Sequence, residues 1–546
     1  MLLYDDFRKK IADCTSGGRI ELHRSDIEID TRGFADFVVK TFRHKDQAAI
    51  GELVERIRGL EFVERCDHSG DYVNVSIRAE SLFSLLDSAI SSTGIFPDVF
   101  QDPERVVVEH TSANPTGPIH VGRIRNSIIG DSMARIYSRY GYRVSTQYFV
   151  NDSGKQVMAM YAGFQRYCAG LPLSVENLLH GYQEIYRHMD ELGGEDAVIS
   201  PLLKRYETPD EALLAEIKNA CSVVLKDIRD TMSRLGISIE DYVWESGFLQ
   251  SEELVEVFES LKPKLKEDGD ARYVQMPWGK KEYLVRSDGT RLYLARDLAY
   301  HLFKAHHFDV IVDVLGEDHK DYARTIGHVL SDLMEVDRRF EFLIYSFISL
   351  EGAKLSTRQG NIITVNDLIE RGREEASRIV SGKENSYDSK TRESIAEAVA
   401  VSSIRFNVIR VNPQKAIVFR WDEALSTEGD SAPFVMYSFA RSTSILDKGT
   451  ASNLRKRQFD VEEKSLLWNM YLYPESLERS LASKRPDLIA AYVLSLTKAF
   501  NDFYSSCQVN VQDDEVRGTR RRIVEMYRTI VKDAADLIGI KMLERM

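Results

Sequence analysis

The stretch VVVEHTSANPTGPIHVGRIRNSIIGD, residues 106–131, decides the fold. Its valine-rich start predicts a buried strand, and Pro115 and Gly117 in its middle predict a turn. Helical spacing of apolar residues follows, from about residue 119 to about residue 140. A strand, a loop and a helix in this order open a Rossmann-type unit.

Three residues at the start of the predicted helix are candidates for binding a triphosphate. His120, Gly122 and Arg123 fall in its first turn, where unpaired backbone N–H groups and the positive end of the helix dipole favour phosphate. Gly122 has no side chain, so a flat base could lie against the backbone. His120 could donate hydrogen bonds to phosphate oxygens in a transition state. An exposed histidine on an ordinary capped helix is the alternative when the motif is taken by itself.

The chain around this stretch predicts a parallel α/β sheet. Further strand-like segments alternate with helices, as a parallel sheet requires. They are YRVSTQYFV at 142–150, KEYLVR at 281–286, RLYLAR at 291–296, FDVIVDVLG at 308–316 and FEFLIYSFISL at 340–350. We therefore expect a Rossmann-type catalytic domain over 101–385, with a helical insertion at about 158–240.

The two flanks have different patterns. Residues 1–100 mix short alternating strands with helical stretches, which predicts a small α+β domain. Residues 386–546 have almost purely helical spacing, which predicts an all-α helical bundle. The fold class is thus multidomain α/β, as a length of 546 residues also suggests.

Composition excludes several classes of protein. With 43% hydrophobic and 29% charged residues and no long apolar run, we expect a cytoplasmic protein without membrane contact. The five cysteines form no C-x-x-C pair, so we expect neither disulfides nor a protein-bound metal. The net charge of −13 argues against a polyanionic partner, but residues 386–546 hold 24 Lys and Arg against 22 Asp and Glu. A basic run at 517–532 is either a solvated face or a nucleic-acid surface.

Two segments resemble the signatures of class I aminoacyl-tRNA synthetases. Residues 112–131 are similar to the HIGH signature, and their S-A-N-P context is typical of the arginyl enzymes. EGAKLSTRQGNIITV at 351–365 resembles the KMSKS loop. The resemblance implies that Lys354 and Ser356 contact the pyrophosphate end of ATP, across from His120 and Gly122.

The chain departs from both signatures. Arg123 stands at the second histidine of HIGH, and Thr357 replaces the second lysine of KMSKS. Some arginyl enzymes compensate with a lysine just before HIGH, where this chain has Gly117. Our hypothesis is that Arg123, Lys354 or Arg358 supplies the missing charge. The alternative is that these cations are solvated.

The arginyl resemblance also implies an amino-acid site. A guanidinium pairs with carboxylates through two parallel hydrogen bonds. Tyr293 and Asp297, one helical turn apart, resemble the Y-x-T-R-D motif that holds arginine, and Glu245 matches a glutamate that meets the guanidinium. Asn114 and His319 match residues at the α-amino end of the amino acid. The segment VNDSGKQ after the second predicted strand also fits the pattern of the arginyl enzymes. We expect its Asn151, Asp152 and Gln156 near ATP or arginine, and we assign Gln156 to ATP.

The C-terminal bundle resembles the arginyl anticodon-binding domain. FVMYSFARSTSIL at 434–446 is similar to the Q-Y-A-x-A-R-x-x-S-I-L helix of that domain. Tyr437 and Arg441 are the matching candidates for tRNA contact, and an exposed tyrosine can stack on an unpaired base. The basic run adds Arg521, Arg522 and Arg528 as candidate phosphate contacts. The first hundred residues resemble the domain that touches the tRNA elbow.

Together the resemblances imply an arginyl-tRNA synthetase that acts as a monomer. Its expected substrates are L-arginine, ATP with Mg²⁺, and tRNA(Arg), and the helical insertion is too short for an editing domain. Two alternatives stay open. One is a tRNA-binding paralogue with weak catalysis, because the signature lysines are missing. The other is a class I enzyme for another amino acid, such as cysteine or glutamine, or another nucleotidyl transferase.

Overall fold

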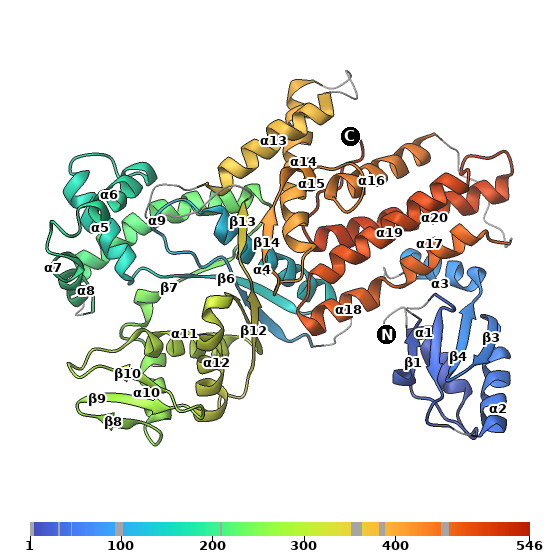
Figure 1. Ribbon diagram of the computed structural model, residues 1–546, viewed down its shortest axis with the longest axis horizontal. Helices are drawn as coiled ribbons and strands as arrows, with labels where there is room; N and C mark the ends of the chain where they lie inside the picture. The colour runs from blue at the N-terminus through green and yellow to red at the C-terminus, as the bar shows by residue number, and fades with distance from the viewer. Residues whose placement is uncertain are drawn as a thin grey trace.

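The computed structural model describes most of the chain. The described residues are 5–30, 33–44, 46–92, 102–207, 210–350, 363–381, 388–448 and 458–546. Figure 1 shows an N-terminal α+β unit, a central sheet with attached helices, and a C-terminal group of long helices that lies between the other two. The predicted multidomain α/β fold is confirmed.

The N-terminal unit is a four-stranded antiparallel sheet with helices. The strand order is β1-β2-β4-β3. Its elements are α1 Asp5–Cys14, η1 Arg24–Asp26, β1 Ile27–Ile29, β2 Phe37–Lys40, α2 Gln47–Arg58, β3 Val63–Ser69, β4 Tyr72–Ile77 and α3 Ala79–Ser92. The sequence pattern did not indicate β3, because polar residues interrupt its apolar positions.

The central sheet has five parallel strands. Its order is β12-β11-β5-β6-β7. The strands are β5 Arg105–Glu109, β6 Arg143–Val150, β7 Asp241–Trp244, β11 Val310–Gly316 and β12 Arg339–Tyr345. The three valines of β5 are fully buried, as expected of a strand covered on both faces. Strand order reverses at β5, and open α/β sheets bind ligands outside the carboxyl ends of strands at such a point.

Helices connect these strands. Helix α4, Val121–Tyr140, follows β5 as predicted. The predicted helical insertion consists of α5 Lys155–Tyr167, α6 Val175–Arg187, α7 Glu195–Val198, α8 Ser200–Glu207 and α9 Glu211–Arg234. Further along lie η2 Glu245–Phe248, α10 Glu252–Leu261, α11 Tyr293–His307, η3 Glu317–His319, α12 Lys320–His328 and the π-helical turn η4 Val329–Leu333.

One predicted strand is present but belongs to a different sheet, and one predicted strand is a helix. KEYLVR forms β10, Lys281–Val285, but β10 belongs to a separate antiparallel sheet with β8, Lys266–Asp268, and β9, Ala271–Gln275. A tight hairpin explains this, because Lys281 pairs with Gln275 only six residues earlier. RLYLAR is not a strand, since helix α11 begins at Tyr293. Its short apolar alternation fits the first turn of a helix equally well.

In the described residues of the last third, the regular structure is helical with one exception. Its helices are α13 Val365–Ser381, α14 Ser389–Ile409, α15 Trp421–Ala424, α16 Ala432–Asp447, α17 Val461–Tyr471, α18 Tyr473–Ser483, α19 Asp487–Ser506 and α20 Asp514–Leu537. The exception is β14, Ile417–Phe419, which pairs in parallel with β13, Ile348–Leu350. Helices α13 and α14, on either side of residue 385, both pack on α4. The domain limits at 100 and 385 stay a prediction.

The N-terminal unit packs on the C-terminal helices. Phe37 meets Trp468 edge-on at a centroid distance of 5.3 Å, and Arg8 pairs with Glu475 at 2.6 Å. In Figure 1 the blue unit accordingly lies beside α17 and α18. Among the helices that the structure describes, none is both long and apolar enough to cross a bilayer.

Candidate active site

The candidate phosphate site begins where the chain turns from β5 into α4. His120 is the N-cap residue of α4, and a Cβ at Gly122 would lie 3.0 Å from its imidazole ring. A side chain at position 122 would therefore displace the imidazole. Burial lowers the pKa of His120, with a smaller contribution from Arg123, so the ring is neutral at neutral pH. Its Nδ1 is buried and has no hydrogen-bond partner among the described residues.

The second signature lies mostly outside the described residues, and so do Lys354, Ser356 and Arg358. Its C-terminal end is described and is attached to the first signature. The N–H of Val121 donates to the carbonyl of Ile363 at 3.1 Å, and the N–H of Val365 donates to Ile119 at 3.0 Å. His120 and Thr364 thereby form an isolated β-bridge. Two segments about 240 residues apart in the chain thus meet at the start of α4.

A pocket of about 480 Å³ lies at the carboxyl edge of the sheet. It is lined by residues at or just after the ends of four strands, namely Glu109, Asn151, Glu245, Leu315 and His319. Tyr293 and Asp297, both from α11, also line the pocket. The structure thus brings together four of the five residues predicted for arginine, and the fifth is Asn114.

Asp297 forms a half-buried negative charge in this pocket. The Tyr322 hydroxyl donates to its Oδ2 at 2.6 Å, and His301 lies 3.3 Å from its Oδ1. Burial raises the pKa of Asp297, but His301 and Tyr322 more than offset this and hold it below its ordinary value. Tyr293 is 59% exposed, and its ring lies 5.6 Å from that of Tyr322. The two tyrosines form an aromatic wall next to the carboxylate.

One carboxylate oxygen of Glu245 is paired with an arginine of the protein itself. It is 4% exposed, and Arg296 Nε donates to its Oε1 at 2.9 Å. Its Oε2 is buried and has no partner among the described residues. Burial raises the pKa of Glu245, while Arg296 lowers it. The predicted contact with a substrate guanidinium therefore has one carboxylate oxygen available, because an internal guanidinium uses the other.

The remaining predicted residues have simpler surroundings. Asn114 Nδ2 donates to Gln156 Oε1 at 2.8 Å, so these two residues lie together, although neither belongs to the pocket lining that the described residues form. His319 lines the pocket and is exposed, with its Nε2 3.6 Å from Asp318. Asp152, which we expected near the substrates, is buried and accepts a hydrogen bond from the N–H of Ser246 at 2.9 Å.

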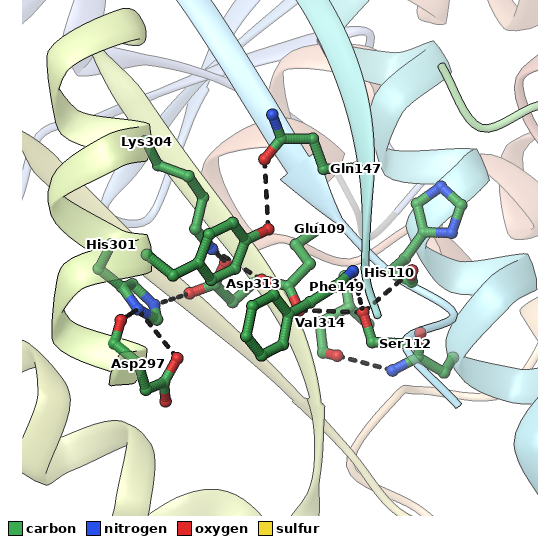
Figure 2. A network of polar contacts seen from close by, with 12 residues as sticks. Glu109, His110, Ser112, Gln147, Phe149, Asp297, His301, Lys304, Asp313 and Val314 are labelled. Carbon is green, nitrogen blue, oxygen red and sulfur yellow. Dashed lines mark hydrogen bonds and ion pairs between the residues drawn. The ribbon is translucent and has the colours of Figure 1, made fainter. Parts of the chain in front are cut away.

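A buried charge network below the pocket was missed in the sequence. Figure 2 shows Lys304, His301, Asp313 and Glu109 in one connected group, with Asp297 at its edge. Lys304 Nζ lies 2.7 Å from Glu109 and 2.6 Å from Asp313, and it is fully buried. His301 Nε2 lies 2.8 Å from Asp313. The available signal was an aspartate in the middle of the apolar run VIVDVLG.

The predicted tRNA residues fall into two groups. Arg441 is exposed on α16, lies 4.7 Å above the ring of Tyr504, and donates to Asn501 at 2.9 Å. Tyr437 is half-buried one turn earlier on the same helix. These two keep a surface position that suits a nucleic acid.

The three arginines predicted from the basic run contact other parts of the chain. Arg521 donates to the carbonyl of Leu446 at 2.9 Å, and Arg522 pairs with Asp87 of the N-terminal unit at 2.6 Å. Arg528 lies over the Phe439 ring at 5.1 Å and 3.7 Å from Glu544. Because these cations hold parts of the chain together, the structure does not support the phosphate-tracking surface that we expected, and their contact with tRNA remains only a prediction.

Comparison with known proteins supplies the family. Residues 86–421 match the family profile described as tRNA synthetases class I (R), catalytic domain, and residues 435–546 match the DALR anticodon binding domain. The chain is also 44% identical to the arginine–tRNA ligase of Thermoplasma acidophilum, over 100% of both chains. It belongs to the arginyl-tRNA synthetase family. It is therefore a class I aminoacyl-tRNA synthetase and a ligase.

Further similarities agree with this family. The arginine–tRNA ligase of Archaeoglobus fulgidus is 34% identical, with 91% of each chain covered. The solved arginyl-tRNA synthetase of Thermus thermophilus superposes with a TM-score of 0.86 at 23% identity, over 100% of both chains. That of Plasmodium falciparum superposes with a TM-score of 0.82 at 19% identity, over 99% of this chain and 98% of the other. At such identities the structural likeness shows the fold alone. The predicted arginyl-tRNA synthetase family is confirmed, and the reading as a class I enzyme for a different amino acid is not supported.

Proposed function

We propose that the chain activates L-arginine with ATP and transfers the arginyl group to the 3′ end of tRNA(Arg). The observation that carries this proposal is the placement of Asp297, Glu245 and Tyr293 around one pocket at the carboxyl edge of the sheet. A buried and a half-buried carboxylate with unequal pairing suit a ligand that brings a positive charge and several N–H donors.

Within the proposed arginine site, Asp297 takes the guanidinium of the substrate. Its carboxylate is ionised and oriented by Tyr322, so it can accept two parallel N–H bonds without first losing a proton. The free Oε2 of Glu245 accepts a further N–H. His319 at the pocket wall and Asn114 are proposed at the α-amino end of the amino acid. A neutral amino acid of similar length would give Asp297 and the Oε2 of Glu245 no cationic N–H donors, which disfavours its binding.

The proposed ATP site is the start of α4. His120 and Gly122 offer a neutral imidazole and an open backbone, and the segment at 363–365 holds the end of the signature loop against them. Gln156 stays a candidate for ATP contact. Lys354, Ser356, Arg358 and Arg123 stay the candidates for charge at the pyrophosphate end. Mg²⁺ is expected to arrive with ATP, bound mainly by its phosphates.

The proposed reaction proceeds in two steps. An oxygen of the arginine α-carboxylate attacks the α-phosphorus of ATP, the bond to the bridging oxygen breaks, and pyrophosphate leaves with the electron pair. A hydroxyl of the 3′-terminal ribose of tRNA then attacks the arginyl carbonyl carbon, its proton is lost, and AMP leaves. The protein contributes positions and fixed charges, and no covalent enzyme intermediate is needed.

The other two parts of the chain are proposed to hold the tRNA. We assign the anticodon to the α16 surface around Tyr437 and Arg441, where an exposed guanidinium lies over the exposed ring of Tyr504. Stacked aromatic and guanidinium planes are suitable platforms for unpaired bases. The N-terminal unit is assigned to the tRNA elbow. We expect a cytoplasmic monomer.

Aminoacylation of total tRNA with each of the twenty amino acids tests the proposal. We expect tRNA to be charged with arginine and with no other amino acid. We also expect arginine-dependent exchange of pyrophosphate into ATP when tRNA is present, and the same assay without tRNA shows whether exchange requires it. The missing signature lysines favoured a tRNA-binding paralogue with weak catalysis as the alternative, but the 44% identity to an arginine–tRNA ligase over the whole chain supports the enzyme. Tight tRNA binding without exchange under any of these conditions would establish the paralogue.

A further inference from the structure

Both ring nitrogens of His301 face oxygen atoms in a closed interior. Nδ1 lies 2.8 Å from the backbone carbonyl of Asp297, and Nε2 lies 2.8 Å from Oδ2 of Asp313. A carbonyl can only accept, so Nδ1 carries a proton. The Asp313 carboxylate also receives Lys304 Nζ at 2.6 Å and acts as an acceptor, so Nε2 carries a proton as well. The geometry therefore requires the doubly protonated imidazolium.

The groups around His301 explain why a buried imidazolium is stable. Its own helix α11 supplies Asp297 and Lys304, β11 supplies Asp313, and β5 supplies Glu109. From β12, the Phe340 ring lies 6.5 Å away and carries no charge. Burial and Lys304 lower the pKa of His301, but Asp313 and Asp297 outweigh them and raise it to about 10.

The charge of His301 has a consequence for the pocket. Against the effect of burial, His301 and Lys304 hold the pKa of Asp297 and of Asp313 below the ordinary value, so both of these carboxyls are ionised. Burial raises the pKa of the third carboxyl, Glu109, and Lys304 opposes this rise. With a neutral His301 the two ionised carboxylates that face it would lose a positive charge, and their pKa would rise.

We propose that His301 is a positioning residue of the reaction, whose imidazolium keeps the Asp297 carboxylate ionised and correctly oriented for the cationic side chain of the substrate. Its 3.3 Å contact with Asp297 Oδ1 and the Tyr322 bond to Oδ2 hold both oxygens of this carboxylate. Figure 2 shows the imidazole between Asp297 and Asp313. The inference rests on the proposed role of Asp297 in binding arginine.

The variant His301→Gln tests the proposal, and His307→Gln is its matched control. His307 lies on the same helix and makes the same 2.8 Å contact with the carbonyl four residues earlier, but it is exposed and its partner is Phe303. In pyrophosphate exchange at pH 7.5, we expect His301→Gln to raise the KM for arginine by about tenfold or more, with the KM for ATP changed less than about twofold. His307→Gln should leave both constants near the wild-type values.

The pH profile separates this role from a merely structural one. His301 helps to hold the pKa of Asp297 below its ordinary value, so its loss raises that pKa, and Asp297 becomes protonated at higher pH. The acid limb of kcat/KM for arginine should therefore move up by about one pH unit in His301→Gln. Adding Asp313→Asn removes one of the two carboxylates that face position 301. The double variant should therefore move the acid limb back, while the KM for arginine stays raised.

Two further measurements distinguish a wrong role for His301 from a wrong arginine site. In the wild-type protein, nitrogen-15 NMR of labelled histidine should show an imidazolium at His301 from pH 6 to pH 8, and a neutral ring there would overturn the proposal even if every variant failed to fold. If Asp297→Asn raises the KM for arginine but His301→Gln changes neither the KM nor the acid limb, the positioning role is wrong. If Asp297→Asn also has no effect, the proposed arginine site itself is wrong.

Discussion

At the scale of single residues, Asp297 shows how a short motif acquires its chemistry from its surroundings. The i, i+4 spacing predicted that it shares a helical face with Tyr293. Its charge state depends on His301 and on Tyr322, which comes from another helix. A carboxylate that is half-buried, ionised and held by two partners can bind a cation with little reorganisation.

Asp297→Asn should therefore impair arginine binding selectively. It removes the charge but keeps the volume, so the KM for arginine should rise about 10- to 100-fold, as expected for loss of a charged hydrogen bond. The KM for ATP should change little. Arginine-dependent pyrophosphate exchange measures both constants, and Asp321→Asn, an exposed residue on α12, is the control. Equal loss of affinity for ATP and arginine would point to general disruption instead.

Gly130 tests how tightly α4 packs on β5. A Cβ at this position would lie 2.2 Å from His110 Cβ, so Gly130→Ala should lower the free energy of unfolding by about 1–3 kcal/mol. Gly51 in α2 is exposed and meets nothing within 4 Å, so Gly51→Ala should raise stability by about 0.5–1 kcal/mol. Urea unfolding followed by circular dichroism measures both, and the two changes should have opposite signs.

At the scale of elements, Arg125 joins α4 to the strands that lead into the second signature. This fully buried guanidinium donates to the carbonyls of Ser346, Asn412 and Lys415 at 2.5, 3.0 and 2.6 Å. Ser346 lies between β12 and β13, and β13 leads into the signature loop at 351–365. Burial lowers the pKa of Arg125 to about 10, which still leaves it charged at neutral pH. One side chain of α4 thus holds the segment from which that loop departs.

We expect Arg125→Met to affect ATP use more than arginine binding. The three carbonyls would lose their shared donor, so unfolding free energy should fall by about 1–3 kcal/mol. The KM for ATP should rise, or kcat should fall, while the KM for arginine stays within about twofold of the wild-type value. Arg139→Met on the same helix is the control, because Arg139 pairs with Asp533, away from this segment. A rise confined to the KM for arginine would contradict the expectation.

At the scale of the whole molecule, arginines of the C-terminal helices connect the parts of the chain. Arg522 reaches Asp87 and Ser91 of α3, although the sequence places it in an apparently solvated basic run. Arg441, in contrast, remains exposed beside Tyr504. The arginines in this part of the chain therefore have different expected effects on tRNA binding.

Salt dependence distinguishes the two arginines. A phosphate contact contributes nearly one unit to the slope of log affinity against log salt concentration. Arg522→Ala should leave this slope for tRNA unchanged, whereas Arg441→Ala should lower affinity and reduce the slope by about one if it contacts phosphate, or lower affinity alone if it stacks on a base. Filter binding over a range of salt concentrations provides the measurement. A reduced slope in Arg522→Ala would restore the phosphate role predicted from the sequence.

The class of fold, the order of the three parts and the residues at the start of α4 could all be predicted from the sequence, because they depend on local periodicity, turn chemistry and short signatures. The sequence also indicated Tyr293, Asp297, Glu245 and His319, which the structure places around one pocket. Which charges meet could be seen only in the folded chain. The Glu245–Arg296 pair, the His301 network and the Arg522–Asp87 contact join residues 51, 12 and 435 positions apart at their key contacts. Ionic partners depend on position in space, and periodicity along the chain carries no information about them.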